Sequence, residues 1–189
     1  MSAVLLIAVP LLAAFLSILS KKIAPYLLLG SALFNLVIMF FLPVGFVVIG
    51  GFIEPLGINL LFDTYAKIAL FLVDGLILVV TFLNLKPFGK FATVLLLALA
   101  SLNGLVLTND LFNLFVFLEI AGIAAYLISS SNRKPGHTFH YLVLGAVGSS
   151  LYLFGLIILY AMFGTLNMVG LIDKIQLNGN YGNLVLPFV

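Results

Sequence analysis

The sequence predicts an all-α membrane protein that crosses the bilayer several times. Of its 189 residues, 64% are hydrophobic and only 7% are charged, whereas about a quarter of the residues in an average soluble domain are charged. The mean hydropathy is +1.34. Six apolar runs are each about 18–25 residues long, enough for a helix to cross roughly 30 Å of hydrocarbon. We therefore expect one polytopic membrane domain over residues 1–189.

The predicted spans and the segments between them follow in chain order. The spans are residues 3–20, 25–42, 64–85, 91–108, 111–129 and 139–163. In residues 44–62, short Val-, Ile- and Phe-rich runs flank Gly50–Gly51 and Pro55–Gly57. This pattern predicts a small β-hairpin between the second and third helices, with an irregular interfacial loop as the alternative. Residues 165–183 alternate apolar and polar residues, which is typical of a short interfacial helix.

Basic residues in the loops predict the orientation of the chain. Six of the eight lie in three loops on one side of the predicted topology: Lys21, Lys22, Lys86, Lys90, Arg133 and Lys134. The opposite side has the N-terminus, Glu54 and the Asn109–Asp110 turn. Because basic loops face the cytoplasm, we expect the N-terminus outside the cell. The first span is not a cleaved signal peptide, since its lysines follow the apolar stretch instead of preceding it.

The composition and motifs exclude several classes of function. The chain has no cysteine, which excludes disulfides, thiolate-bound zinc and iron–sulfur clusters. Its two histidines do not form an axial-ligand pair for haem, and no phosphate-binding or metalloprotease motif is present. The few basic residues form no patch for nucleic acid. We expect no catalytic chemistry, no cofactor and no metal site, and we expect the lipid bilayer and other membrane proteins as partners.

Glu119 is the most informative residue, because it is the ninth residue of the fifth span. A charged side chain near the middle of the membrane costs a few kcal/mol or more to bury, and such residues commonly serve function. No basic residue lies within four positions of Glu119, so any partner comes from another helix. A carboxyl group in apolar surroundings resists ionisation and can exchange protons. Proton handling is the favoured interpretation, and a structural buried acid is the alternative.

The third span carries a second set of charges. Asp63 and Lys67 are four residues apart, so they share a helix face and can pair. Asp74 follows Lys67 by seven residues, which places it on the same face about two turns deeper. These residues form either an ion pair near the outer surface with one acid facing a partner helix, or a polar track that leads into the bilayer.

Four further polar residues are weaker candidates. His140 opens the sixth span and could relay protons, but a solvated histidine is ordinary at the interface. Asn103, Asp110 and Ser149 could line a polar path. Helix packing is the expected role of Asn103 and Ser149, and Gly145 and Ser149 form a small-xxx-small pair that lets helices approach closely.

Three segments resemble one family of membrane proteins. Residues 50–72 read GGFIEPLGINLLFDTYAKIALFL and are similar to the GGW-x-P-P-x-G-I-x-L-x-x-D stretch that opens that family's helix 3. Residues 108–128 read TNDLFNLFVFLEIAGIAAYLI and resemble its helix-5 pattern, D-L-F-x-L-F-V-x-x-E. Residues 140–150 read HYLVLGAVGSS and are similar to its helix 6, often K-Y-x-x-L-G-A-x-x-S. The family is that of antiporter-like subunits, the ion-pumping membrane subunits of respiratory complex I, Mrp cation/proton antiporters and membrane-bound hydrogenases.

The resemblance implies roles for particular residues. Glu119 matches the helix-5 glutamate, a key protonatable residue of the family, whereas His140 stands where the helix-6 motif often has lysine. The family's helix 7 normally carries a lysine that pairs with that glutamate. An apolar run begins at Leu184 and stops at Val189, and six residues rise only about 9 Å as a helix. We therefore expect a split N-terminal part, with helix 7 onward and its lysine supplied by another membrane subunit.

Three hypotheses of function follow from these observations. The leading one is an ion-translocating subunit, for H⁺ and/or Na⁺, of a multisubunit respiratory or Mrp-type complex in a prokaryotic cell membrane. The second is a non-conducting structural subunit of such a complex. The third is a small free-standing secondary transporter. An unpaired acid in mid-membrane favours the first hypothesis over the second, and the lack of an internal inverted repeat argues against the third.

Overall fold

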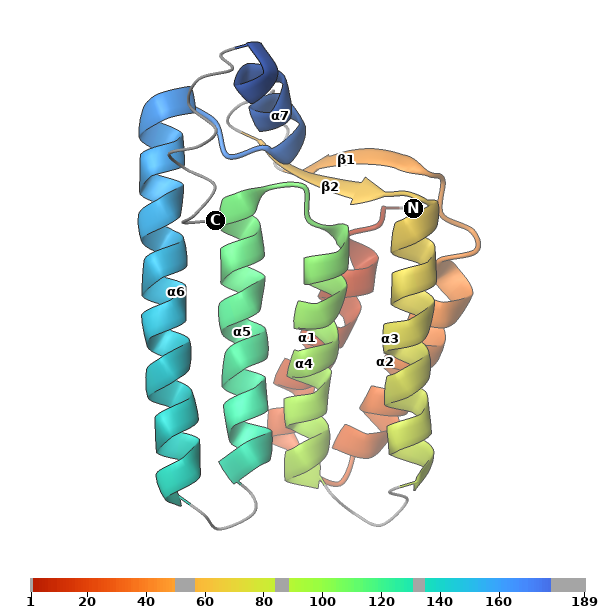
Figure 1. Ribbon diagram of the computed structural model, residues 1–189. Coiled ribbons are helices and arrows are strands. Elements are labelled where there is room, and N and C mark those ends of the chain that lie inside the picture. Colours follow the sequence, from red (N-terminus) through yellow and green to blue (C-terminus); the bar gives the residue numbers. More distant parts are fainter. Residues whose placement is uncertain (1, 50–56, 84–88, 131–134, 178–189) are drawn as a thin grey trace.

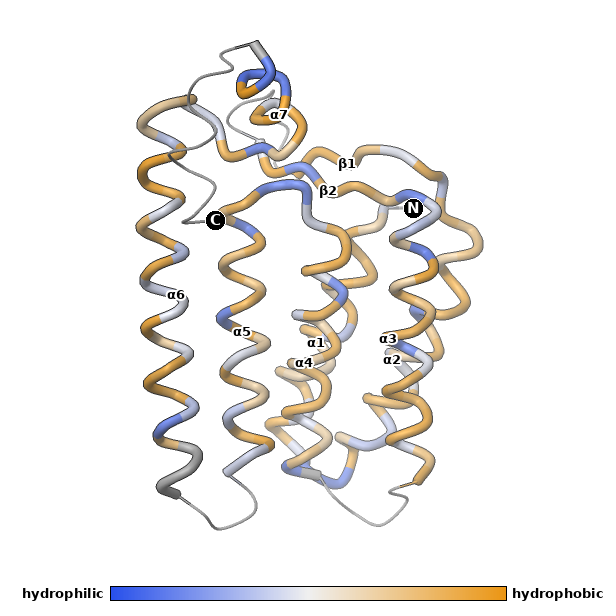
Figure 2. Tube along the Cα trace, in the orientation of Figure 1, coloured by the Kyte–Doolittle hydropathy of each residue, from blue (hydrophilic) through white to orange (hydrophobic). Residues whose placement is uncertain are grey.

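The computed structural model describes residues 2–49, 57–83, 89–130 and 135–177. In this part of the chain six long helices stand side by side, and a two-stranded sheet and a short helix lie across one end (Figure 1). Hydrophobic residues cover most of the length of the long helices, with isolated hydrophilic positions part-way along α3, α4 and α5 (Figure 2). The predicted all-α polytopic fold with a small hairpin is confirmed.

Four of the long helices are long and apolar enough to cross a membrane. They are α3 (Thr64–Leu83), α4 (Gly89–Leu107), α5 (Leu111–Ser130) and α6 (Pro135–Phe163). The helices α1 (Leu5–Leu19) and α2 (Ala24–Ile38) have 15 residues each and rise only about 22 Å. The predicted lengths of the first two spans were therefore wrong. Extended backbone at Ser20 ends α1, and the chain leaves α2 through turns over residues 39–42.

The helices α1 to α4 form a bundle, and α5 and α6 extend it on one side. Each of α1 and α2 packs against α4, α2 also packs against α1 and α3, and α3 packs against α4. The fifth helix packs against α4, and α6 packs against α5 (Figure 1). Accordingly, 56% of the apolar stretch of α4 is buried, against 11% for α5 and 17% for α6.

The hairpin covers the end of this bundle. Strands β1 (Gly45–Ile49) and β2 (Ile58–Phe62) are antiparallel, with Val47 opposite Leu60. Leu60 and Phe62 are two residues apart in β2, so they face the same side. Both are fully buried among residues of α1, α3 and α4 at this end of the bundle. The predicted turn residues Gly50–Gly51 and Pro55–Leu56, together with Glu54, lie outside the described residues.

Side-chain caps and backbone bonds join the segments at this hairpin end. Asp63 and Asp110 accept hydrogen bonds from the backbone N–H groups of Ala66 and Asn113, at 2.7 and 2.8 Å, and so cap α3 and α5. Asn167 caps α7 (Met168–Leu177) in the same way. The α4–α5 turn also bonds to β2 and to the segment before α7. These bonds fix the relative position of the bundle and the α5–α6 pair.

At the other end α1, α3 and α5 finish and α2, α4 and α6 begin (Figure 1). Lys21, Lys22 and Lys90 are exposed there, and we call it the basic end. Lys86, Arg133 and Lys134 lie outside the described residues, as do Asn178–Gly179 and the apolar run from Leu184 to Val189.

Candidate functional site

Glu119 lies part-way along α5, eight residues from its first residue, Leu111, or about 12 Å along the helix. Its side chain is partly exposed. Phe115, four residues earlier, stacks on Tyr152 of α6, with ring centroids 6.1 Å apart. Tyr126, seven residues later, packs edge-on against Tyr141 of α6 at 4.9 Å. Residues spaced by four and seven share a helix face, so Glu119 lies on the side of α5 that meets α6.

Glu119 has no polar partner at the contact between α5 and α6 in the described residues. No hydrogen bond or ion pair to its carboxylate occurs within residues 2–49, 57–83, 89–130 and 135–177. Its exposed neighbours on the helix surface, Phe112 and Ile123, are each 48% exposed. Glu119 therefore lies at the edge of the contact between the two helices, where a further protein segment can reach it.

The half of α6 nearest the basic end also faces outward. Between Phe139 and Leu151 every side chain is exposed except Gly145 and Ser149, which are partly buried. A Cβ atom at Gly145 would overlap the hydroxyl of Tyr126, so the small residue lets α5 and α6 approach, as the small-xxx-small pattern predicts. His140 is exposed near the beginning of α6, and its ring lies 6.4 Å from that of Phe139.

Asp74 occupies a very different environment inside the α1–α4 bundle. Its side chain is 0% exposed. Asn35 of α2 donates to Asp74 Oδ1 at 3.1 Å, and Asn103 of α4 donates to Asp74 Oδ2 at 3.5 Å. Both asparagines are also 0% exposed. The structure thus brings together Asp74 and Asn103, two residues that the sequence singles out.

The first helix completes this group with a backbone oxygen. The two side-chain amides that contact Asp74 also donate to the carbonyl of Leu6, Asn35 at 3.2 Å and Asn103 at 3.1 Å. In a regular helix this carbonyl accepts from the residue four positions later, but that residue is Pro10, which has no N–H. Asp74, Asn35, Asn103 and the Leu6 carbonyl form what we call the polar cluster, with one member from each helix of the bundle.

The polar cluster lies between two apolar layers. On the hairpin side are the buried residues that include Leu60, Phe62, Leu70 and Leu107. On the basic side are those that include Leu28, Ile77 and Leu99. Asn35 Oδ1 and Asn103 Oδ1 have no hydrogen-bond partner among the described residues. Because a buried polar atom without a partner is costly, this group is a candidate binding site.

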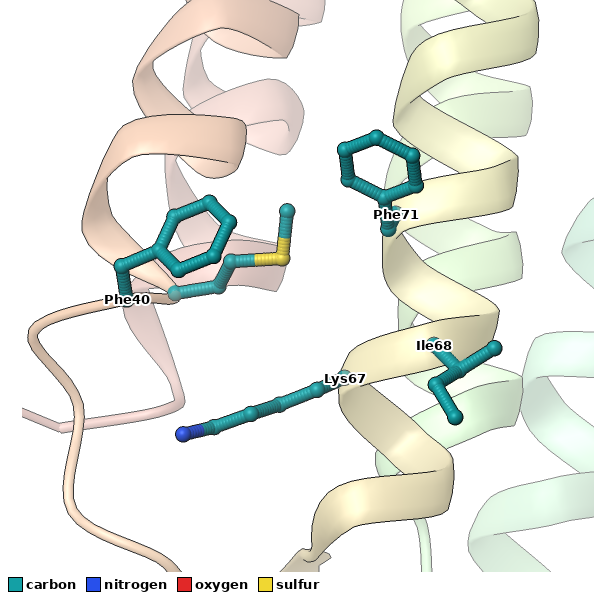
Figure 3. A pocket seen from close by; sticks show the side chains of 5 residues that line it. Phe40, Lys67, Ile68 and Phe71 are labelled. Carbon is teal, nitrogen blue, oxygen red and sulfur yellow. The ribbon is translucent and has the colours of Figure 1, made fainter.

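Lys67 lies away from both acids. Its ammonium is 5.3 Å from the ring centroid of Phe62, a cation–π contact. The side chain extends from α3 toward Phe40, at the end of α2, and with Phe71 lines a cavity of about 230 Å³ (Figure 3). The predicted ion pair with Asp63 is absent from the described part of the chain, because Asp63 caps α3 instead. Asp63, Lys67 and Asp74 do not form a continuous polar track.

Asp110 and Ser149 have local surroundings that explain their residue types. Asp110 caps α5, and burial raises its pKa although backbone hydrogen bonds from Asn113 and Phe112 oppose this rise. Ser149 lies one turn after Gly145, on the face of α6 that meets α5. Neither residue joins Glu119 or the polar cluster through a hydrogen bond in the described residues.

Asn35 and the Leu6 carbonyl were not predicted from the sequence to belong to a site. Both had a signal: Asn35 interrupts the second apolar run, and Pro10 interrupts the first. A proline inside a helix frees the carbonyl four residues before it, and a buried asparagine needs partners. The residues that meet in space come from four helices, so the pattern of any one helix does not show their meeting.

Comparisons with known proteins agree with this fold. Residues 108–189, which include α5 and α6, match the family described as "NADH:quinone oxidoreductase/Mrp antiporter, TM". One curated relative, NADH-quinone oxidoreductase subunit N of Desulforudis audaxviator (strain MP104C), is 39% identical over 140 residues, which are 65% of this chain and 26% of that protein. Another, a Na⁺/H⁺ antiporter subunit of Bacillus subtilis (strain 168), is 32% identical over 143 residues, 71% of this chain and 29% of that protein.

The chain resembles the antiporter-like subunits, as its motifs predict. A chain in the structure of the membrane-bound sulfane sulfur reductase, an archaeal respiratory membrane complex, superposes with a TM-score of 0.80 at 32% identity. The superposition covers 89% of the present chain and 39% of that chain. The present chain thus spans between about a quarter and two fifths of the lengths of these antiporter-like relatives. It is a multi-pass membrane protein, and the structural neighbour described above belongs to a respiratory membrane complex.

Proposed function

We propose that the chain is an ion-translocating part of a multisubunit respiratory or Mrp-type membrane complex, with no catalytic chemistry of its own. In this proposal Glu119 takes up and releases the proton that is moved. The observation that carries the proposal is the position of Glu119: an acid part-way through an apolar helix, partly exposed, and without a polar partner among the described residues. Acids at such depth mark ion and proton pathways.

The geometry of α5 and α6 supports a second component of the proposal. An ionised carboxylate at this depth is not stable alone, and both helices present open apolar faces beside it. A further membrane segment, from this or another polypeptide, packs on these faces and places a lysine within about 4–7 Å of Glu119, close enough to exchange protons directly or through one water. Lys67, His140 and Asp74 would act elsewhere on the ion path, since none of them contacts Glu119.

Substitution of Glu119 in the intact complex tests the proposal. Glu119→Gln keeps the side-chain volume but cannot exchange a proton, so we expect assembly to persist and ΔpH formation in membrane vesicles to fall below about a tenth of the wild-type rate. Glu119→Asp should be milder. Asp173→Asn, at an exposed acid of α7, is the matched control and should pump normally. Unchanged pumping in the Gln variant would assign Glu119 a structural role and favour a non-conducting subunit.

A structure of the intact complex tests the partner separately. We expect a lysine ammonium facing Glu119 from a segment that covers α5 and α6. If lipid or only apolar side chains surround Glu119, the proposed mechanism fails.

We further propose that the basic end faces the cytoplasm of a prokaryotic cell, so that the N-terminus lies outside. Single cysteines are clean probes because the native chain has none. Lys22→Cys at the basic end should react with an impermeant thiol reagent only after the cells are opened, whereas Lys174→Cys at the hairpin end should react in intact cells. The reverse pattern would invert the topology.

A further inference from the structure

Lys67 is a cation in apolar surroundings, and the described part of the chain holds no anion that contacts it. Its ammonium lies 5.3 Å from the ring centroid of Phe62. Asp63, one turn earlier, accepts a hydrogen bond from the backbone of Ala66 instead. Asp74, two turns later, is enclosed by the asparagines of the polar cluster. The charge of Lys67 is therefore available to an anion that is not one of these acids.

The cavity that Lys67 lines lies where α2 ends and α3 continues toward the hairpin. The 20 residues of α3 rise about 30 Å, the thickness of the hydrocarbon, whereas the 15 residues of α2 rise about 22 Å. Directly after α2, Met39 and Phe40 face Ile68 and Phe71 of α3 across this cavity of about 230 Å³ (Figure 3). Lys67 is thus the one charged residue of an otherwise apolar lining.

This cavity opens on the outer surface of the bundle. Phe40, Ile68 and Phe71 are 72%, 57% and 54% exposed. The two helices that form the cavity pack against each other and against α4, and α5 and α6 stand on another side of α4 (Figure 1). The partner segment proposed for Glu119 therefore covers a different face. Because α3 is long and apolar enough to span a membrane, the exposed side of the cavity faces the bilayer.

The depth of Lys67 places its two ends in different parts of a bilayer. It is three residues after Thr64, the first residue of α3, or about 4.5 Å along the helix. Its ammonium turns back to Phe62 of β2, at the hairpin end. Lysines near helix ends keep their apolar stem in hydrocarbon and extend the ammonium to the headgroups. Tyr65, which is 81% exposed, is of a residue type that is enriched at this interface.

We propose that the cavity binds one anionic phospholipid from the leaflet at the hairpin end. Its phosphate contacts the ammonium of Lys67, and the upper part of an acyl chain packs against Phe40, Ile68 and Phe71. A lipid has the same order of groups as the cavity, with charge at the interface and apolar atoms below it. A zwitterionic headgroup carries its own cation, whereas the net charge of phosphatidylglycerol neutralises Lys67. The proposal does not depend on Glu119; where Lys67 serves the ion path, the lipid phosphate is its counter-anion.

Quenching of an introduced tryptophan by brominated lipid tests the site. The chain has no tryptophan, so Phe71→Trp is a single reporter within the cavity. The full chain is placed in phosphatidylcholine bilayers that contain increasing fractions of brominated phosphatidylglycerol or brominated phosphatidylcholine with the same acyl chains. We expect half-maximal quenching at an about fivefold lower fraction of phosphatidylglycerol, the effect of one lysine near an anionic headgroup. Adding Lys67→Gln should abolish this preference, and raised salt should weaken it.

Two controls separate this site from general attraction between the protein and anionic lipid. Leu12→Trp is 61% exposed in the native chain and lies seven residues after the first residue of α1, as Phe71 does in α3. Because α1 has no charged residue, the two brominated lipids should quench this reporter equally. Lys22→Gln, added to the Phe71→Trp chain, removes an exposed cation at the basic end and should leave the preference unchanged.

Three results would overturn the proposal. If the two lipids quench Phe71→Trp equally, the cavity does not select an anionic headgroup. If the preference survives Lys67→Gln, another group causes it. If neither lipid quenches Phe71→Trp while both quench Leu12→Trp, protein covers the cavity. Should Phe71→Trp fail to give folded protein, Phe40→Trp, on the opposite wall, should show the same preference and the same loss with Lys67→Gln.

Discussion

The α1–α4 bundle and the α5–α6 pair each hold one acid part-way through an apolar helix, but in opposite settings. In the bundle, Asp74 is fully buried and receives hydrogen bonds from two helices. In the α5–α6 pair, Glu119 is partly exposed and has no partner among the described residues. The bundle thus supplies hydrogen-bond donors to Asp74 from its own helices, whereas α5 and α6 supply none to Glu119 within the described residues, which is why we propose a partner segment only at the second acid.

Truncation of each acid to alanine should separate the two regions most strongly. Asp74→Ala leaves the Asn35 and Asn103 donors short of an acceptor, and we expect it to cost about 2–4 kcal/mol of unfolding free energy. Glu119→Ala removes no hydrogen bond from the described residues and should change stability by less than about 0.5 kcal/mol. Unfolding of the purified chain in detergent measures both values. Equal losses at the two positions would remove the distinction between them.

The boundary between the regions can be tested at Gly104 of α4. A Cβ atom there would overlap the ring of Phe117 on α5, so we expect Gly104→Ala to destabilise the chain by about 1–3 kcal/mol. Gly75→Ala on α3 is the matched control, because a Cβ atom at Gly75 meets nothing within 4 Å. The control should be neutral or up to about 1 kcal/mol more stable, since alanine favours the helix. Adding Phe117→Leu to the Gly104→Ala variant should partly restore its unfolding free energy. Equal behaviour of the two glycines would contradict the close packing of α4 and α5.

Most of the fold could be predicted from the sequence, because the length of an apolar run and the residues that end it determine a helix or a hairpin locally. The hairpin follows from β-branched runs around glycine and proline. Glu119 was predicted as a candidate because a single acid in an apolar run is visible in the sequence without knowledge of its neighbours in space. The lengths of α1 and α2 were overestimated, because hydropathy cannot distinguish the last turn of a helix from the apolar turns that follow it, as at residues 39–42.

The errors at the sites have a common physical cause. The spacing of Asp63 and Lys67 allows an ion pair, but the free N–H groups at the start of α3 compete for the carboxylate and bind it. The polar cluster depends on four helices that are distant in sequence, and one of its members is a backbone atom released by Pro10.

The smallest expected effect concerns Asp110, where the bundle joins the α5–α6 pair. Burial raises its folded-state pKa above the ordinary value for aspartate. The stability that this shift contributes is therefore fully present below the unfolded-state pKa and is lost as pH rises through the folded-state pKa. Asp110→Asn keeps an oxygen to cap α5 but does not titrate. Relative to the wild type, we expect Asp110→Asn to gain stability as pH rises above about 4, the ordinary pKa of aspartate, as unfolding curves of both proteins at several pH values would show. Parallel pH profiles would mean that the hydrogen bonds of the cap cancel the effect of burial on this pKa, and a wild type that gains on the variant as pH rises would mean that they outweigh it.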